Sequence, residues 1–301
     1  MSAGQKPNIA IETLTGRPAE FLFAAKDNRG LPGQFAYWRG ENGHVFLDPV
    51  PADLDRYYAE GYQPIPESEA DLAKVAKGDA YRLDHIKKLQ PTGTFLEIGP
   101  WIGLTAYSAK QAGYAVSAIE RDSACVDLLR RCGIKAIQSF DPAETLENLD
   151  ESFDVIGMWH SIEHLPRPWE VLRASARRLN PGGILVVAAP NPESAQFRVL
   201  GKHWVHLDAP RHIHFLPIAL VKQLCENEGL ALVAATSDDH LGLMLEEHGW
   251  RSEIFRRAFN IPGLKTVLYR LGWQRLRAKH RVAGAIDGAG YSLIFQRPPG
   301  S

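Results

Sequence analysis

Short apolar segments alternate with helix-like or loop segments over most of the chain. The first four apolar segments are each followed by such a connection, and this order is typical of crossover units in a mostly parallel sheet. The pattern predicts an α/β fold. Seven segments read as strands, at residues 94–98, 115–120, 134–138, 153–158, 184–189, 230–236 and 291–296.

The segment before the first of these strands has the period of a helix. Its apolar residues recur at a spacing near 3.6 positions with charged residues between them, which predicts a helix from Glu67 onward. Pro91 and Gly93 predict its end. The apolar positions are Leu72, Val75, Ala76, Leu83, Ile86 and Leu89.

Two further regions flank this pattern. The first 65 residues are rich in Gly, Pro and aromatic residues and look irregular, apart from two short strands expected at 35–38 and 44–47. The connection between the last two predicted strands is long, so it should carry structure of its own. We therefore expect an N-terminal extension (1–65), a main domain (66–236 and 286–301) and a helical insertion (237–285).

The insertion is basic. Nine Lys or Arg residues between 251 and 281 face a single acid, Glu253. Apolar residues at i, i+3, i+4 and i+7 predict an amphipathic helix over 264–271. Such a helix either contacts an anionic membrane surface or acidic ligand, or caps the substrate pocket with its charges in water.

The overall charge is balanced, with 34 basic and 35 acidic residues. This balance gives no reason to expect nucleic acid as a partner. Cys125, Cys132 and Cys225 cannot form a disulfide framework, which is typical of a reducing compartment. The first twenty residues lack the layout of a signal peptide, and the longest apolar run is far too short to span a membrane. We expect a cytoplasmic protein, with membrane association through the insertion as an option.

A glycine-containing turn follows the first strand of the main domain. Glu97 lies near the end of the strand, Gly99 and Gly103 bracket the turn, and a helix should start at Leu104. A dinucleotide fingerprint would need glycine at 99, 101 and 104. Trp101 and Leu104 break that pattern, and the Glu97 carboxylate would repel a pyrophosphate. An acid at this turn instead suits a positively charged cofactor.

The turn resembles the first motif of the class I S-adenosylmethionine-dependent methyltransferases, in which an acid, one residue and glycines spaced by two follow the first strand. Glu97, Gly99 and Gly103 match this motif, and Trp101 replaces its middle glycine. The resemblance implies a Rossmann-like, doubly wound sheet of seven strands with an antiparallel last strand. It also implies S-adenosylmethionine as the cofactor, bound by these four residues.

The same resemblance places cofactor contacts at the ends of the next two strands. Glu120 would accept hydrogen bonds from the ribose hydroxyls, with Arg121 beside it. Phe140 would stack on the adenine, and Asp141 would accept from its amino group.

A histidine-containing segment follows the fourth strand. His160, Glu163 and His164 match the H-x-x-E-H pattern of inverted zinc proteases, but that site needs a sustained helix, which Pro166 and Pro168 would interrupt. The segment also resembles the fourth-strand motif of the methyltransferases. In that family His160 would face cofactor and substrate, and Glu163 and His164 would start the next helix.

Six of the eleven histidines lie between residues 160 and 214. Related methyltransferases carry a stretch like 207–212 next to the substrate pocket. Since the segment has no cysteines and no evenly spaced acids, we expect no metal ion in it. Histidine titrates near neutral pH, so the candidate bases for a hydroxyl acceptor are His160, His164, His212 and His214.

The N-terminal strand pair resembles a degenerate zinc ribbon, in which Gly40 and Gly43 stand where relatives carry cysteines. Without thiolates we expect no zinc there. The tyrosines that follow would either cover the cofactor pocket as a lid or pack in the core, and they are Tyr57, Tyr58 and Tyr62.

These features predict a methyltransferase that acts on a small molecule, either a sugar or glycan precursor or a secondary metabolite. Methyl transfer is an in-line displacement, and positioning of the reactants supplies most of its acceleration. Two alternatives remain. One is an NAD-dependent oxidoreductase, which Trp101 and Leu104 disfavour, and the other is a non-catalytic cofactor-binding protein of the same fold.

Overall fold

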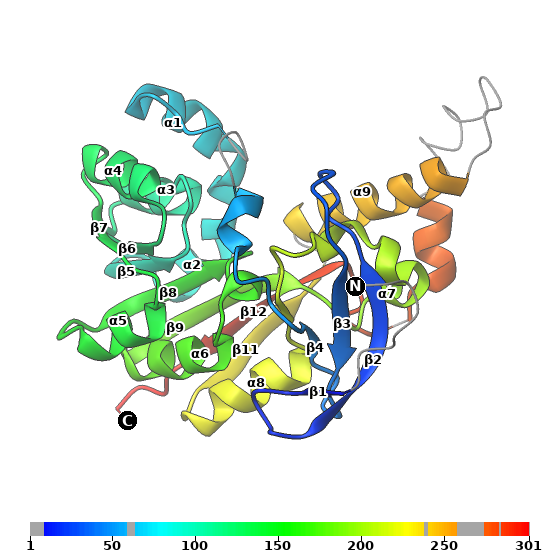
Figure 1. Ribbon diagram of the computed structural model, residues 1–301. Helices are drawn as coiled ribbons and strands as arrows, with labels where there is room; N and C mark the ends of the chain where they lie inside the picture. The colour runs from blue at the N-terminus through cyan, green and yellow to red at the C-terminus, as the bar shows by residue number, and fades with distance from the viewer. Residues whose placement is uncertain (1–8, 59–63, 238–239, 258–273, 283, 301) are drawn as a thin grey trace.

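The computed structural model describes residues 9–58, 64–237, 240–257, 274–282 and 284–300. Its strands form a seven-stranded sheet, in the order β11-β12-β9-β8-β5-β6-β7, and a five-stranded sheet, in the order β1-β2-β3-β4-β10 (Figure 1). The larger sheet consists of β5 (Thr94–Ile98), β6 (Ala115–Glu120), β7 (Lys135–Gln138), β8 (Phe153–Trp159), β9 (Leu179–Pro190), β11 (Ala231–Thr236) and β12 (Gly290–Gln296).

Strands β5 to β9 run parallel to one another. Strand β12 lies antiparallel between β9 and β11. The expected mostly parallel sheet of seven strands with an antiparallel last strand is therefore confirmed. The chain moves to one side of β5 through β6 and β7 and to the other side through β8 and β9. Ligands of open α/β sheets bind at such a switch point, outside the carboxyl ends of the strands.

Helices cover both faces of this sheet. Side chains of α5, α6 and α8 pack with Leu96, Ile98 and Ile156 on one face, and side chains of α1 to α4 pack on the other. The helices with stated bounds are α1 (Glu69–Ala76), α2 (Leu83–Leu89), α3 (Leu104–Gln111), α4 (Ser123–Arg131), α5 (Pro142–Asn148), α6 (Pro168–Arg177), α7 (Ala195–Leu200), α8 (Ile218–Asn227) and α9 (His240–Arg257). Residues 274–280 are helical as well.

The segment predicted as one helix from Glu67 is divided into three. Helix α1 is capped by Ser68, whose side chain accepts from the Asp71 amide. A 3₁₀ helix, η2 (Lys77–Arg82), separates α1 from α2. Gly78 lies in this break, and glycine costs about 1 kcal/mol relative to alanine in a helix interior.

The five-stranded sheet is larger than the predicted strand pair. It consists of β1 (Ala10–Ile11), β2 (Pro18–Ala25), β3 (Phe35–Arg39), β4 (Val45–Leu47) and β10 (His214–Phe215). Strands β3 and β4 correspond to the expected pair. Strand β10 comes from the main part of the chain and pairs with β4, a non-local contact that a local pattern does not reveal. This arrangement does not confirm the resemblance to a zinc ribbon.

The described part of the insertion is helical. Helix α9 carries the fully buried Trp250, which packs with residues of the five-stranded sheet such as Tyr37. The amphipathic segment 264–271 lies outside the described residues. Within the described part of the chain, no helix combines the length and apolar character needed to cross a membrane.

Candidate functional site

The loop after β5 keeps the backbone shape that glycine normally supplies. Gly99, Trp101 and Gly103 all have positive φ angles, of 67°, 51° and 79°. A Cβ atom at Gly99 would lie 2.6 Å from the Ser161 side chain, and one at Gly103 would lie 2.2 Å from Leu129. Both glycines are therefore needed for space as well as conformation. Trp101 replaces the family's middle glycine but retains its left-handed backbone, at a cost of order 1–3 kcal/mol.

The Glu120 carboxylate binds this loop to the end of β6. Its Oε2 accepts from the Trp101 amide at 2.8 Å, and its Oε1 accepts from the amides of Arg121 and Asp122 at 2.7 and 2.9 Å. Burial raises the pKa of Glu120, and these amide donors partly offset the effect. The carboxylate is thus fixed at the switch point, where the sequence predicted an acceptor for ribose hydroxyls.

Glu97 lies below the start of α3 and is 3% exposed. Burial raises its pKa to about 7, against the opposing effects of the Arg82 charge and hydrogen bonds from Ala106 and Thr105. Its Oε2 has no hydrogen-bond partner among the described residues. The loop therefore holds a carboxyl group that a nearby cation would ionise, while a phosphate would not be favoured.

Arg121 occupies the rim of this region. It pairs with Asp55 at 2.6 Å, and its guanidinium lies 5.7 Å from the Tyr58 ring centroid and 5.4 Å from that of Phe140. Phe140 is 70% exposed, so its ring is open to a ligand. Asp141, in contrast, caps α5 by accepting from two of its amides.

His160 follows the last residue of β8 and also has a positive φ, of 53°. Its side chain is 25% exposed, and its Nδ1 lies 3.4 Å from Oε1 of the buried Glu163. Burial would raise the pKa of Glu163, but the hydrogen bond and charge of His160, with the charges of His212 and His164, hold it at about 2. Glu163 is therefore a buried carboxylate surrounded by imidazoles.

The sequence predicted that Glu163 and His164 start the next helix, and this prediction is wrong. They lie in a three-residue 3₁₀ turn, η3 (Ile162–His164), and α6 begins only at Pro168. Pro166 cannot donate a backbone hydrogen bond, and the residue before a proline is disfavoured in helical conformation. This short turn is incompatible with the helical zinc-protease site, and it lets Glu163 and His164 face different neighbours.

His164 and His212 lie together, with ring centroids 4.5 Å apart. His164 Nδ1 lies 3.0 Å from the Arg211 carbonyl and 2.9 Å from the Tyr58 hydroxyl. His212 Nδ1 lies 2.8 Å from the His206 carbonyl. Burial lowers the pKa of His164 to about 4, so this imidazole is neutral at pH 7.

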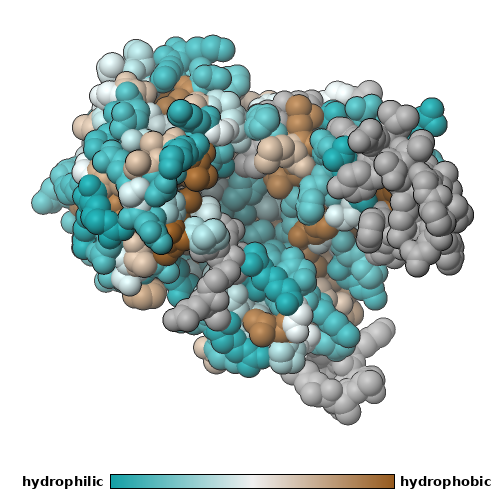
Figure 2. All heavy atoms as spheres, turned by 90° about the horizontal axis from the view of Figure 1, so that it is seen from above, coloured by the Kyte–Doolittle hydropathy of each residue, from teal (hydrophilic) through white to brown (hydrophobic). Residues whose placement is uncertain are grey.

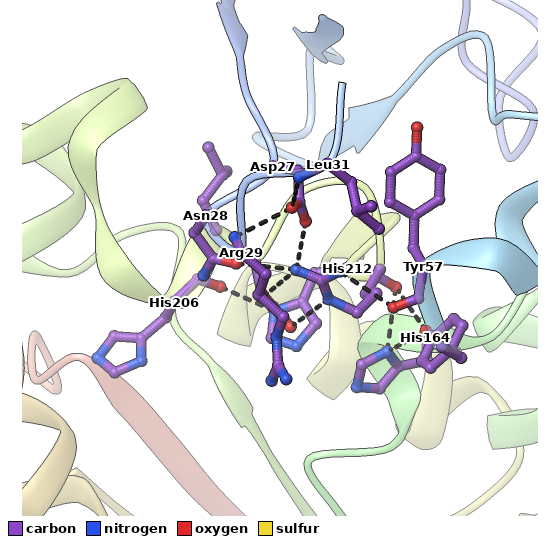
Figure 3. Close-up of polar contacts among 12 residues, drawn as sticks. Asp27, Asn28, Arg29, Leu31, Tyr57, His164, His206 and His212 are labelled. Carbon is purple, nitrogen blue, oxygen red and sulfur yellow. Dashed lines mark hydrogen bonds and ion pairs between the residues drawn. The ribbon is translucent and has the colours of Figure 1, made fainter. Parts of the chain in front are cut away.

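The turn that carries His212 is anchored by Arg211, which is fully buried. Its guanidinium contacts Asp208 and Asp27 at 2.8 and 2.7 Å. Asp27 belongs to the N-terminal region, so a residue distant in sequence helps to fix the position of His212. Polar contacts join a continuous group of residues here that includes Asp27, Asn28, Tyr57, His164, His206 and His212 (Figure 3).

His214, the fourth candidate base, points elsewhere. It bonds to His44 at 3.0 Å and to the Pro166 carbonyl at 3.2 Å, and burial lowers its pKa to about 3. His44 in turn contacts Glu12 at 2.7 Å. His214 therefore joins the five-stranded sheet to the loop after β8 and does not take part in the cluster around Glu163.

Of the three tyrosines discussed as a lid, Tyr57 packs in the core against Phe35. Tyr58 belongs to η1 (Leu54–Tyr58) and contacts both Arg121 and His164. Tyr62 lies outside the described residues. Seen from above, the surface is hollowed between the part that carries α1, α3 and α4 and the part that carries α9 and the N-terminal strands (Figure 2).

Comparison with known proteins gives the family. A family model described as a methyltransferase domain matches residues 73–235. The chain belongs to this methyltransferase family. The expected membership among class I S-adenosylmethionine-dependent methyltransferases is thus confirmed, and the oxidoreductase alternative gains no support.

Relatives of known name are similar over part of their length. A ubiquinone biosynthesis O-methyltransferase of Hahella chejuensis is 29% identical over 157 residues, which are 49% of this chain and 66% of that protein. One of Xanthomonas oryzae pv. oryzae is 31% identical over 142 residues, 44% of this chain and 59% of that protein. The matches to these two relatives thus span less than two thirds of their length. A solved S-adenosylmethionine-dependent methyltransferase of Archaeoglobus fulgidus superposes with a TM-score of 0.48 at 17% identity, and the match covers 74% of this chain and 94% of that one.

Three residues of the site have contacts that their sequence context did not predict. Glu163 is central to the histidine cluster, Arg211 anchors it, and Tyr58 connects it to the cofactor side. The only sequence signal for Glu163 was its place in the segment after β8. Its burial depends on the loop at 206–212, which is distant in sequence.

Proposed function

We propose that this protein transfers the methyl group of S-adenosylmethionine to a hydroxyl group of a small molecule. The observation that carries the proposal is the position of two sets of residues at one edge of the sheet. The loop 99–103 with Glu120 follows β5 and β6, and His160 with Glu163 follows the neighbouring β8. Cofactor residues and a candidate base thus meet at the switch point.

The loop residues fit this cofactor. S-adenosylmethionine carries an ammonium and a sulfonium, and it supplies an electrophilic methyl group whose departure leaves a neutral thioether. The buried carboxyl of Glu97 favours such positive charge. Glu120 offers a fixed acceptor for ribose hydroxyls, and the exposed ring of Phe140 beside Arg121 can stack on adenine.

His160 is the histidine best placed to act as the base. It is partly exposed, whereas His164 is tied by hydrogen bonds and kept neutral by burial. Because Nδ1 faces the Glu163 carboxylate, a hydrogen on Nδ1 would point at that carboxylate and leave Nε2 to accept the hydroxyl proton. The O–H bond breaks, its electron pair stays on oxygen, and the oxygen attacks the methyl carbon. His212 contributes by shaping the pocket beside Glu163.

A hydroxyl acceptor is also supported by the relatives, which are named O-methyltransferases. Within this class, phenols, sugars and other secondary metabolites are the acceptors to test. We also propose that the basic insertion is the part of the chain that an acidic acceptor or an anionic membrane surface would approach.

Titration calorimetry with S-adenosylmethionine and with NADH tests the cofactor. We expect binding of the former alone, and Glu120→Ala should weaken it about tenfold or more, since tenfold corresponds to about 1.4 kcal/mol. Glu144→Ala, which removes an exposed acid of α5, should leave the affinity unchanged. Turnover to S-adenosylhomocysteine with a panel of hydroxyl acceptors tests the reaction. Binding without turnover for every acceptor would favour a non-catalytic protein of this fold.

A further inference from the structure

One buried carboxylate and two imidazoles form a cluster beside His160. One nitrogen or oxygen from each of Glu163, His164 and His212 lies within 4.8 Å of the others. The contact between His160 Nδ1 and Glu163 Oε1 is long, at 3.4 Å, and neither Glu163 oxygen has a well-formed hydrogen bond among the described residues, although the residue is only 1% exposed. An ionised carboxylate in such a place is costly unless a positive charge balances it.

Backbone carbonyls orient both imidazoles from behind. His164 Nδ1 faces the Arg211 carbonyl at 3.0 Å, and His212 Nδ1 faces the His206 carbonyl at 2.8 Å. A carbonyl oxygen can only accept, so His212 carries its hydrogen on Nδ1 and keeps a lone pair on Nε2. His164 takes the same form when its Nδ1 donates to the Arg211 carbonyl and the Tyr58 hydroxyl, 2.9 Å from the same nitrogen, donates to that carbonyl as well. His212 Nε2 lies 4.0 Å from Glu163 Oε1. Metal-ligating histidines are typically held in this way, with the second ring nitrogen donating to a carbonyl or carboxylate.

We propose that Glu163, His164 and His212 bind one divalent transition-metal ion of the Zn²⁺ type. Two imidazoles and one carboxylate are a donor set that suits such ions, and three protein ligands leave a further position open. In a tetrahedral site, bonds of ~2.0–2.2 Å place two donors about 3.3–3.6 Å apart. The 4.0 Å between His212 Nε2 and Glu163 Oε1 is slightly longer, so the cluster needs a small inward movement of side chains to bind the ion.

This proposal departs from the expectation that the histidine-rich segment holds no metal. That expectation rested on the absence of cysteines and of evenly spaced acids, whereas the three ligands come from two loops, after β8 and before β10. The loops are brought together by the Arg211 anchor and by the Ile213 amide, which bonds to the Glu163 carbonyl at 2.9 Å. His160, 3.4 Å from Glu163 Oε1, borders the open position.

The ion has a use in the reaction, and this part rests on the proposed function. An acceptor oxygen in the open position would be polarised by the ion, which favours loss of its proton. His160 Nε2 would receive that proton, and the oxygen would keep the electron pair. The metal site itself stands on the geometry of the cluster alone.

Metal titration of the full chain tests the site. After dialysis against a chelator, we expect one equivalent of Zn²⁺ to bind, and Co²⁺ to give a visible absorption band typical of few-coordinate nitrogen and oxygen ligation. Glu163→Gln or His212→Ala should weaken Zn²⁺ binding by at least about 100-fold. Removing only the hydrogen-bond partner of a metal ligand already lowers metal affinity about 10–100-fold, and these substitutions remove a ligand itself. His85→Ala removes an exposed histidine of α2 and should leave binding unchanged.

Stoichiometric binding that is lost in both ligand variants supports the proposal. Failure of the unaltered protein to bind Zn²⁺, or equal binding by Glu163→Gln, would overturn it in favour of a protonated imidazole as the partner of Glu163. Circular dichroism shows whether each of the two ligand variants folds. If one of them does not fold, the metal affinity of the other tests the site. Titrating the same samples with S-adenosylmethionine separates the two claims, since failure to bind the cofactor would contradict the proposed function and leave the metal result standing.

Discussion

At the scale of single residues, we expect Glu97 to make cofactor binding dependent on pH. Its pKa is raised to about 7 by burial, so the carboxyl is neutral below that pH and ionised above it. A positively charged cofactor prefers the ionised form. We expect the affinity for S-adenosylmethionine to rise about tenfold or more between pH 5.5 and 7.5, as linkage requires when one proton is released.

Calorimetry across this pH range measures the effect. Glu97→Gln keeps the shape of the side chain and removes the titration, so its affinity should be low and nearly constant. Any remaining change of affinity with pH in that variant would come from the titration of the amine of S-adenosylmethionine itself. A wild-type affinity that does not change with pH would show that Glu97 does not interact with the cofactor charge.

His160 carries the second prediction at this scale. His160→Asn should lower kcat by about 10²–10⁴-fold, the usual contribution of general base catalysis. Asparagine tolerates the positive φ at this position better than most residues, so the backbone should remain in place. The control is His203→Asn, at an exposed histidine in η4 (Gly201–His203). The measurement is the rate constant for S-adenosylhomocysteine formation by each variant. A kcat of His160→Asn within twofold of that of the unaltered protein would exclude His160 as the base.

The two candidate sets differ in how far the sequence could predict them. Gly99 and Gly103 follow a strand directly, so their roles depend on a local turn that a short motif encodes. Glu163 and His212 are far apart in sequence, and their proximity depends on a buried ion pair between Arg211 and Asp27 that no local pattern contains. The motif located the candidate cofactor loop, but the environment of the histidines required the fold.

At the scale of elements, the Arg211 anchor holds the turn that carries His212 against the N-terminal region. Asp27→Asn removes one of its two charged partners from a fully buried position. Breaking a buried pair in this way is destabilising, and with Asp208 still in place we expect a loss of about 3 kcal/mol in the free energy of unfolding, the low end of the usual range.

Urea denaturation measures this loss. Asp53→Asn is the matched control, because it breaks an exposed pair with Arg56 in the same region, where the cost should be about 0–1 kcal/mol. Equal effects of the two substitutions would show that the buried anchor contributes no more than a surface contact.

Element boundaries also show what the chain pattern could and could not reveal. Central strands of the main sheet such as β5, β8 and β12 are short apolar runs with buried side chains on both faces, so their positions could be predicted closely. Strand β2 (Pro18–Ala25) has a mixed burial pattern, and β10 has two residues. Such strands form because a neighbouring strand is present, which explains why the N-terminal region looked irregular.

At the scale of the whole molecule, three sets of contacts join the N-terminal region to the later part of the chain. Strand β10 pairs with β4, the hydrogen bonds from Glu12 through His44 and His214 reach Pro166, and Arg211 pairs with Asp27. Glu12, His44, His214, Arg211 and Asp27 are all buried, and Arg211 and Asp27 anchor the turn that carries His212. We expect the two sheets to unfold together.

Hydrogen exchange with and without the cofactor tests this cooperativity. A ligand present at 100 times its Kd stabilises the folded state by about 2.7 kcal/mol, which slows exchange through global unfolding about 100-fold. If the sheets unfold as one unit, the slowest amides of β3 and β4 should slow by the same factor as those of β6 and β9, although only the larger sheet carries the proposed cofactor residues. If the smaller sheet unfolded by itself, its amides would exchange at the same rate with and without the cofactor. The contacts of His214 and Arg211 would then hold the histidine cluster in place without coupling the stability of the two sheets.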